Sequence, residues 1–145
     1  MQVRHILQDK GRDIIGIADS ATLAEAARIL AEHHVGALVI QDSGDALAGI
    51  FSECDLVRAV ADDGALSLSC AVAAYMSRQV TTCHESDTVE EIMEIMTRGR
   101  FRHVPVLDKR QHLAGMISIG DVVKTHIAET LSEANSLRDY ISTAL

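Results

Sequence analysis

A twelve-residue segment that occurs twice places the strongest constraint on the fold. Residues 47–58 read LAGIFSECDLVR, and residues 113–124 read LAGMISIGDVVK. Each copy is an apolar run that ends on a serine and continues into a helix-forming segment, with an aspartate three residues after the serine. The serines at 52 and 118 and the aspartates at 55 and 121 share one separation of 66 residues. The chain therefore contains an internal duplication.

The duplication extends well beyond this segment. Residues 14–59 and 80–125 align without a gap. In each copy an extended apolar run precedes a threonine, Thr22 or Thr88, and a glutamate three residues later, which predicts a capped helix start. Two apolar runs joined by a short polar turn follow, at residues 42–45 in the first copy, and such runs pair as a hairpin. The predicted order of each repeat is βαββα.

Two repeats are too few for a solenoid, so we expect the two copies to pack on each other about a pseudo-twofold axis. The predicted fold class is α/β, with a short N-terminal helix and a longer C-terminal one. The expected boundaries are 1–66 for the first repeat with its lead-in, 67–130 for the second repeat, and 131–145 for the C-terminal helix. The lead-ins also correspond, with Leu7 matching Met76.

Composition limits the classes of partner. The net charge of −8 argues against a nucleic-acid or anionic-membrane partner, because affinity for phosphate comes from clustered Lys and Arg. Three cysteines without a CxxC spacing imply no disulfide framework. No apolar run suits a signal sequence or a membrane span, so we expect a cytoplasmic protein.

The repeated serine and aspartate have a chemical interpretation. A hydroxyl and free N–H groups at the start of a helix suit a phosphate or ribose oxygen. A carboxylate in the first turn can accept hydrogen bonds from the two adjacent hydroxyls of a ribose. A basic residue three positions after the aspartate returns to the same helix face and could neutralise phosphate. These residues are Ser52, Asp55 and Arg58 in the first copy, and Ser118, Asp121 and Lys124 in the second.

Helix capping is the alternative interpretation of the same residues. Serine is a favoured N-cap, and an aspartate in the first turn interacts well with the helix dipole. Taken alone, either copy fits capping better than ligand binding. The joint recurrence of the preceding Leu-Ala-Gly and the following basic residue favours a site, although a duplicated fold would also duplicate its caps.

Taken together, these patterns resemble a tandem pair of CBS domains, the Bateman module, over about residues 1–130. The resemblance rests on the βαββα order, Thr82 ahead of Thr88, the strand at residues 102–106, and the G-h-h-S-x-x-D segments (h, apolar) at 49–55 and 115–121. It is greatest to stand-alone bacterial CBS-pair proteins with no attached enzyme.

The resemblance implies a regulatory protein that binds AMP, ADP or ATP, and in some members NAD or S-adenosylmethionine, between the repeats. It implies no enzyme activity and no cofactor beyond the regulatory ligand. It also implies a homodimer that signals to an effector protein. Carried over by position, the ligand-binding candidates are Thr82, Cys83, Arg102, His103, Val104, Ser118 and Asp121 in the second repeat, and Gly16, Ile17, Ser52 and Asp55 in the first.

The two copies differ in charge. Glu53 in the first copy stands where the second has Ile119, and a carboxylate ~4–6 Å from a phosphate is repulsive by about a kcal/mol or more. The second copy also has Arg102 and His103 where the first has a glycine and an alanine. We therefore expect the stronger nucleotide site at Asp121.

Four alternatives stay open or are set aside. The chain could be a ligand-independent scaffold whose C-terminal helix binds a partner, or a thiol sensor that uses Cys54 or Cys83. We expect no metal site, because the adjacent His33 and His34 point about 100° apart on a helix. No nucleophile–base set or P-loop is present, so an enzyme is the weakest alternative.

Overall fold

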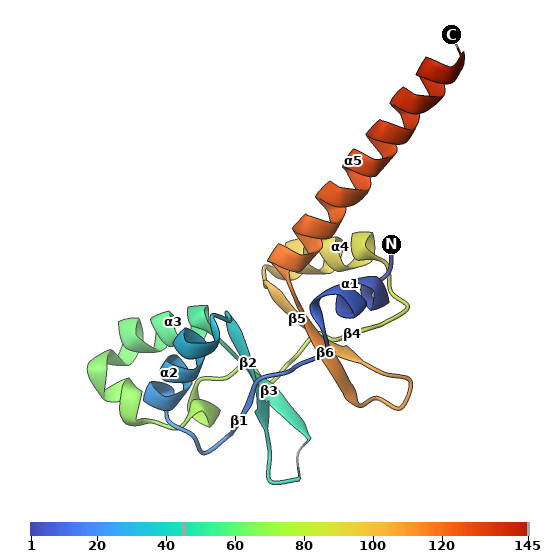
Figure 1. Ribbon diagram of the computed structural model, residues 1–145. Coiled ribbons are helices and arrows are strands. Elements are labelled where there is room, and N and C mark those ends of the chain that lie inside the picture. Colours follow the sequence, from blue (N-terminus) through green and yellow to red (C-terminus); the bar gives the residue numbers. More distant parts are fainter. Residues whose placement is uncertain (45, 145) are drawn as a thin grey trace. The chain divides into compact units, whose positions relative to one another are not determined.

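The computed structural model describes residues 1–44 and 46–144 and forms two compact units (Figure 1). One unit consists of Met1–Arg12 with Thr82–Leu145, and the other of Asp13–Thr81. Asp45, in the predicted turn, and Leu145, at the end of the predicted C-terminal helix, lie outside the described residues.

The unit of Asp13–Thr81 has the predicted βαββα order. Its sheet runs β1-β2-β3, with β1 parallel to β2 and β2 antiparallel to β3. The core between the sheet and its helices is built on Leu23, Leu38 and Phe51, none of them exposed to solvent. The elements are β1 (Gly16–Ala18), α2 (Leu23–His33), β2 (Ala37–Gln41), β3 (Leu47–Ser52) and α3 (Glu53–Asp63), followed by the 3-10 turns η1 (Gly64–Ser69) and η2 (Val72–Ala74).

The other unit repeats this arrangement and adds α1. Its sheet runs β4-β5-β6, with β4 parallel to β5 and β5 antiparallel to β6, so the predicted order of the second repeat is confirmed as well. Its core is built on Val3, Leu7, Ile92 and Ile117. The elements are α1 (Val3–Lys10), β4 (Cys83–His84), α4 (Val89–Gly99), β5 (His103–Leu107), β6 (Leu113–Ser118) and α5 (Ile119–Ala144).

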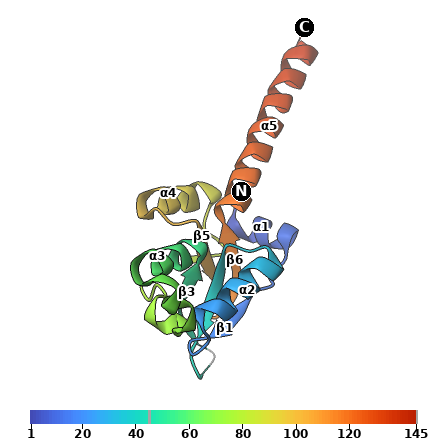
Figure 2. The same ribbon diagram turned by 90° about the vertical axis from the view of Figure 1, so that its left-hand side faces the viewer.

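The C-terminal helix is not a separate element. One helix, α5, runs from Ile119 to Ala144, whereas the sequence suggested a helix after Ser118 and a further one over residues 131–145. No glycine or proline follows Gly120 in this segment, so nothing interrupts the backbone hydrogen bonds. Figure 2 shows that the distal half of α5 projects away from its unit.

Each lead-in packs on a glycine in the strand of the other repeat. A Cβ atom added at Gly115 in β6 would lie 2.7 Å from Leu7 Cδ2. A Cβ added at Gly49 in β3 would lie 2.6 Å from the Ser77 carbonyl oxygen and 3.0 Å from Met76 Sδ. The predicted correspondence of Leu7 with Met76 is thus confirmed, and the close approach explains a glycine at both strand positions.

This exchange makes the sequence repeats and the compact units two different divisions of the chain. The expected repeats change over between residues 66 and 67, whereas the units change over after Arg12 and again after Thr81. The lead-in of the first repeat lies in the unit that holds the second repeat's sheet, and the reverse holds for the other lead-in.

The turns between the hairpin strands explain why both repeats have an aspartate at the same position, Asp42 and Asp108. Asp42 Oδ1 accepts hydrogen bonds from the N–H groups two and four residues later, at 2.8 and 3.1 Å. Asp108 Oδ1 does the same at 2.8 and 2.9 Å. An aspartate at this place therefore fixes the turn that sets the strand register.

Among the described residues, no helix combines the length and the apolar character that crossing a membrane would require.

Candidate functional site

Both repeated Ser-Asp pairs lie where a strand passes directly into a helix. In the first repeat, Ser52 Oγ accepts from the Asp55 N–H at 3.3 Å, and Asp55 Oδ2 accepts from the Ser52 N–H at 2.8 Å. In the second, the corresponding distances between Ser118 and Asp121 are 3.2 and 2.9 Å. Each pair is therefore a reciprocal cap, and the capping interpretation is realised in both repeats.

Capping does not use up these carboxylates. A carboxylate has two oxygens and about four lone-pair sites, and the cap occupies one oxygen of each aspartate. The side chain of Asp55 is 8% exposed and that of Asp121 22%. Asp121 is thus held in place by its own helix and still reaches solvent, which suits a preorganised acceptor for a hydroxyl pair.

The hairpin register brings several of the predicted residues of the second repeat together. His103 of β5 pairs directly with Ser118 of β6. The first N–H of α5 donates to the carbonyl of Arg102 at 2.8 Å, which closes the strand–helix junction. The first repeat has the same frame, with Gly36 and Ala37 in place of the arginine and the histidine. Only the second junction therefore offers cationic or imidazole side chains at these positions.

The predicted residues of the first strands contribute mainly backbone. Thr82 is half-buried just before β4, while the side chains of Cys83 and Val104 belong to the core. Burial raises the pKa of the Cys83 thiol to about 12, so this group stays protonated at neutral pH. In the other unit Gly16 is exposed and the Ile17 side chain is buried. What these strands can offer a ligand is backbone N–H and C=O groups.

Lys10 belongs to this candidate site, and the sequence did not reveal it. Its Nζ atom donates to Asp121 Oδ2 at 2.7 Å and to the Met116 carbonyl at 2.9 Å. Burial alone would raise the pKa of Asp121, but the hydrogen bonds from Lys10 and from the Ser118 N–H outweigh it and hold that pKa below its ordinary value. The predicted cation, Lys124, is exposed on α5. Because α1 packs in this unit, the cation that contacts Asp121 is Lys10.

Arg58 stands in a looser relationship to Asp55. Its Nη1 atom lies 3.6 Å from Asp55 Oδ1, and the arginine side chain is 70% exposed. Such a pair contributes little, because solvent screens it and the long side chain loses entropy when it is fixed. The two junctions therefore differ in how firmly a cation is held next to the aspartate.

A separate open pocket lies at the other end of the β4-β5-β6 sheet. Its volume is about 390 Å³, and it is formed by α1 and by the C-terminal ends of β4 and β5. Arg4, Lys109 and His84 line it together with Arg12, which forms an ion pair with Glu85. None of the predicted ligand-binding residues is among its lining residues. This pocket is distinct from the Ser-Asp junctions.

The family model of the CBS domain matches the chain twice, over residues 3–62 and 72–127. With two βαββα repeats and a Ser-Asp junction in each, the chain belongs to the CBS-domain family as a tandem pair.

Solved structures of similar proteins share this fold. The CBS-domain-containing protein ATU1752 of Agrobacterium tumefaciens is 46% identical, with a TM-score of 0.84 over 86% of this chain and 92% of that one. The CBS pair of protein MJ0100, in complex with 5-methylthioadenosine and S-adenosylmethionine, is 26% identical, with a TM-score of 0.78 over 89% and 98%. The protein PAE2072 of Pyrobaculum aerophilum, complexed with AMP, is 28% identical, with a TM-score of 0.73 over 83% and 89%.

Proposed function

We propose that the chain is a regulatory module, and not an enzyme, that binds adenine nucleotides at its Ser-Asp junctions. The observation that carries this proposal is the recurrence, at both strand–helix junctions, of a capped aspartate beside a serine hydroxyl. The ligands in the two similar complexes, 5-methylthioadenosine with S-adenosylmethionine and AMP, share an adenosine group. The two adjacent ribose hydroxyls of that group can donate hydrogen bonds to an aspartate.

The geometry of the second junction supports a specific set of contacts. Asp121 accepts hydrogen bonds from the ribose hydroxyls. The Ser118 hydroxyl binds an oxygen of the phosphate or of the ribose. The backbone of Thr82 and Cys83 binds the adenine edge. Lys10, already at the junction, supplies positive charge to a nucleotide phosphate. At the other junction, Ser52 and Asp55 take the same roles, with the backbone of Gly16 and Ile17 for the base and Arg58 for the phosphate.

The nucleotide acts as a regulatory ligand, not as a cofactor. A ligand that binds one arrangement of the two units better than another shifts the population toward that arrangement. An effector protein that recognises the favoured arrangement would then read the concentration of AMP, ADP, ATP, NAD or S-adenosylmethionine. The alternative is a ligand-independent scaffold, in which the projecting part of α5 binds a partner.

A thermal-unfolding screen with these five compounds separates the two proposals. A ligand of the folded protein at 100 times its dissociation constant adds about 2.7 kcal/mol of stability. We expect at least one compound to raise the unfolding temperature, and Asp121→Ala to remove the shift. Asp139→Ala, an exposed aspartate farther along α5, is the matched control. No shift with any compound would favour the scaffold.

We further propose that the chain forms a homodimer through exposed apolar side chains on α3 and α5. On α5 they recur every four residues from Ile119 to Leu131. Val57 on α3, 68% exposed, and Val123 on α5, 47% exposed, hold the same position in the two repeats. Apolar side chains exposed at the same place in both repeats suit a symmetric interface between two copies of the chain.

A further inference from the structure

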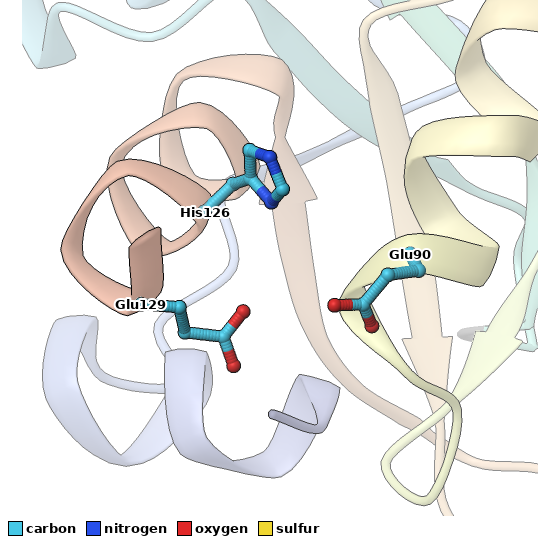
Figure 3. A group of neighbouring side chains, drawn as sticks. All are labelled: Glu90, His126 and Glu129. Atoms are coloured by element: carbon cyan, nitrogen blue, oxygen red, sulfur yellow. The ribbon is translucent and has the colours of Figure 1, made fainter. Parts of the chain in front are cut away.

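A cluster of three metal-ligating side chains lies at the base of α5. Figure 3 shows Glu90 on α4 facing His126 and Glu129 on α5. One possible ligand atom from each residue lies within 4.8 Å of the other two. His126 and Glu129 are three residues apart on one helix, so they share a face, and Glu90 approaches them from the first turn of the packed neighbour.

A positive charge already lies against this cluster. The α-ammonium group of Met1 pairs with Glu129 Oε1 at 2.8 Å. The Met1 carbonyl accepts a hydrogen bond from the Val89 N–H at 3.0 Å, which fixes the ammonium next to Glu90. The surroundings therefore attract a cation.

The fold itself does not require these three residues. At the repeat offset of 66 residues, Glu90 corresponds to Ala24, and His126 and Glu129 to a valine and an aspartate at 60 and 63. A glutamate in the first turn of α4 is favourable for the helix dipole, which accounts for Glu90 alone. The dipole gives no reason for an imidazole and a second carboxylate to converge on it from another helix.

We propose that Glu90, His126 and Glu129 bind a divalent transition metal of the zinc class. One imidazole nitrogen with two carboxylate oxygens is a donor set that zinc accepts, and a water molecule would complete a tetrahedron. With bonds of about 2.0–2.1 Å, tetrahedral donors lie about 3.4 Å apart. Glu90 and His126 are exposed, so changes of side-chain rotamer suffice to close the remaining separation.

Such a metal would join α4 to the base of α5 and would replace the Met1 ammonium as the cation beside Glu129. The sequence indicated no metal site, on the geometry of His33 and His34. Spacing along the chain did not show that packing brings Glu90 and Glu129 to His126. The proposal is independent of nucleotide binding, so it is tested without any nucleotide present.

The test is a zinc titration of the full chain, monitored by competition with a chromogenic chelator. A Cys54→Ser, Cys70→Ser background removes the two exposed thiols, which would otherwise bind zinc. We expect one zinc per chain, and a loss of affinity of about tenfold or more in His126→Asn, Glu129→Gln and Glu90→Gln. The controls His33→Asn and Glu133→Gln, both exposed, should keep the affinity of the parent.

X-ray absorption of the zinc-loaded protein supplies a readout that is independent of mutagenesis. The expected spectrum has nitrogen and oxygen at about 2.0–2.1 Å and no sulfur at about 2.3 Å. Unchanged metal-free unfolding temperatures would show that the variants fold. No binding up to about 0.1 mM zinc, unchanged affinity in His126→Asn, or a sulfur ligand would each overturn the proposal.

Discussion

Lys10 and Asp121 are 111 positions apart in the sequence, and their side chains meet at 2.7 Å. The contact joins the last residue of α1 to the first turn of α5, where the proposed ribose acceptor lies. The carboxylate is therefore compensated by a cation before any ligand arrives. A nucleotide phosphate that approached this junction would meet a lysine beside the aspartate and not an isolated negative charge.

Replacing this lysine should change the acid stability of the protein. The folded-state pKa of Asp121 is lowered, so its stabilising effect is present above the unfolded-state pKa of about 3.9 and is lost as the pH falls through the folded-state value. Lys10→Met removes one of the hydrogen bonds that oppose the effect of burial on Asp121. The pKa of Asp121 should therefore rise. We expect a lower unfolding temperature at pH 7 and a smaller further loss on acidification below about pH 4.

Lys124→Met, which removes an exposed lysine from the same unit, is the control for this measurement. Carboxyl chemical shifts followed by NMR would report the pKa of Asp121 directly. An Asp121 pKa that stays the same in Lys10→Met would show that the lysine does not set it.

The two proposed nucleotide sites should be unequal. Asp121→Ala is expected to reduce nucleotide affinity more than Asp55→Ala, because Glu53 adds negative charge at the first junction and only the second has Lys10. Calorimetric titration of both variants measures the difference, with Asp62→Ala on α3 as the control. Equal losses in the two variants would contradict the asymmetry.

The two lead-in contacts should respond differently to an added methyl group. In Gly115→Ala the new Cβ meets the flexible end of Leu7, which can move aside. In Gly49→Ala it meets the backbone carbonyl of Ser77 at 2.6 Å, so the lead-in itself must shift. We expect Gly49→Ala to lower the free energy of unfolding by about 1–3 kcal/mol and Gly115→Ala by less. Chemical denaturation of both variants gives the comparison, and the reverse order would show that the lead-in at Ser77 is the more adaptable one.

Thiol reactivity tests the thiol-sensor alternative. Cys54 and Cys70 are exposed, whereas Cys83 is buried and its pKa is raised to about 12. At pH 8 a disulfide reagent should therefore modify two thiols of the native protein quickly and the third only after unfolding. Rapid native-state modification of Cys83, located by mass spectrometry, would mean that β4 opens readily and would restore Cys83 as a sensor candidate.

The proposed dimer should depend on the exposed apolar side chains of α5. Val123→Glu places a charge among them and is expected to give a monomer in analytical ultracentrifugation. Ser132→Glu adds the same charge at an exposed position about half a turn around α5 from Val123 and should leave the dimer intact. A wild-type chain that sediments as a monomer would reject the proposal.

The sequence was sufficient for several features that depend on local spacing. The caps at Thr22 and Thr88, the hairpins and the βαββα order each follow from residues within a few positions of one another. The same locality explains why Ser118 and Asp121 could be identified as a pair while their dual use, as a cap and as a proposed site, could not be decided.

What the sequence missed depends on which unit α1 joins. The contact of Lys10 with Asp121, and the approach of Met1 to Glu129, both arise because the first residues pack against the last helix. The matching of Leu7 with Met76 showed that the lead-ins are equivalent, but it contained no information on which sheet each one covers. Spacing along one chain cannot distinguish a lead-in that stays with its own repeat from one that is exchanged.

The exchange of lead-ins also orders events during synthesis. The unit of Asp13–Thr81 is continuous and can form once those residues leave the ribosome, whereas α1 must wait for β6. At about 5–20 residues per second, the interval between Leu7 and Gly115 is on the order of 5–20 s. During that time Val3, Ile6 and Leu7, which are buried in the finished protein, lack the residues that cover them. The nascent chain is therefore most open to chaperone binding and to misassembly in this interval.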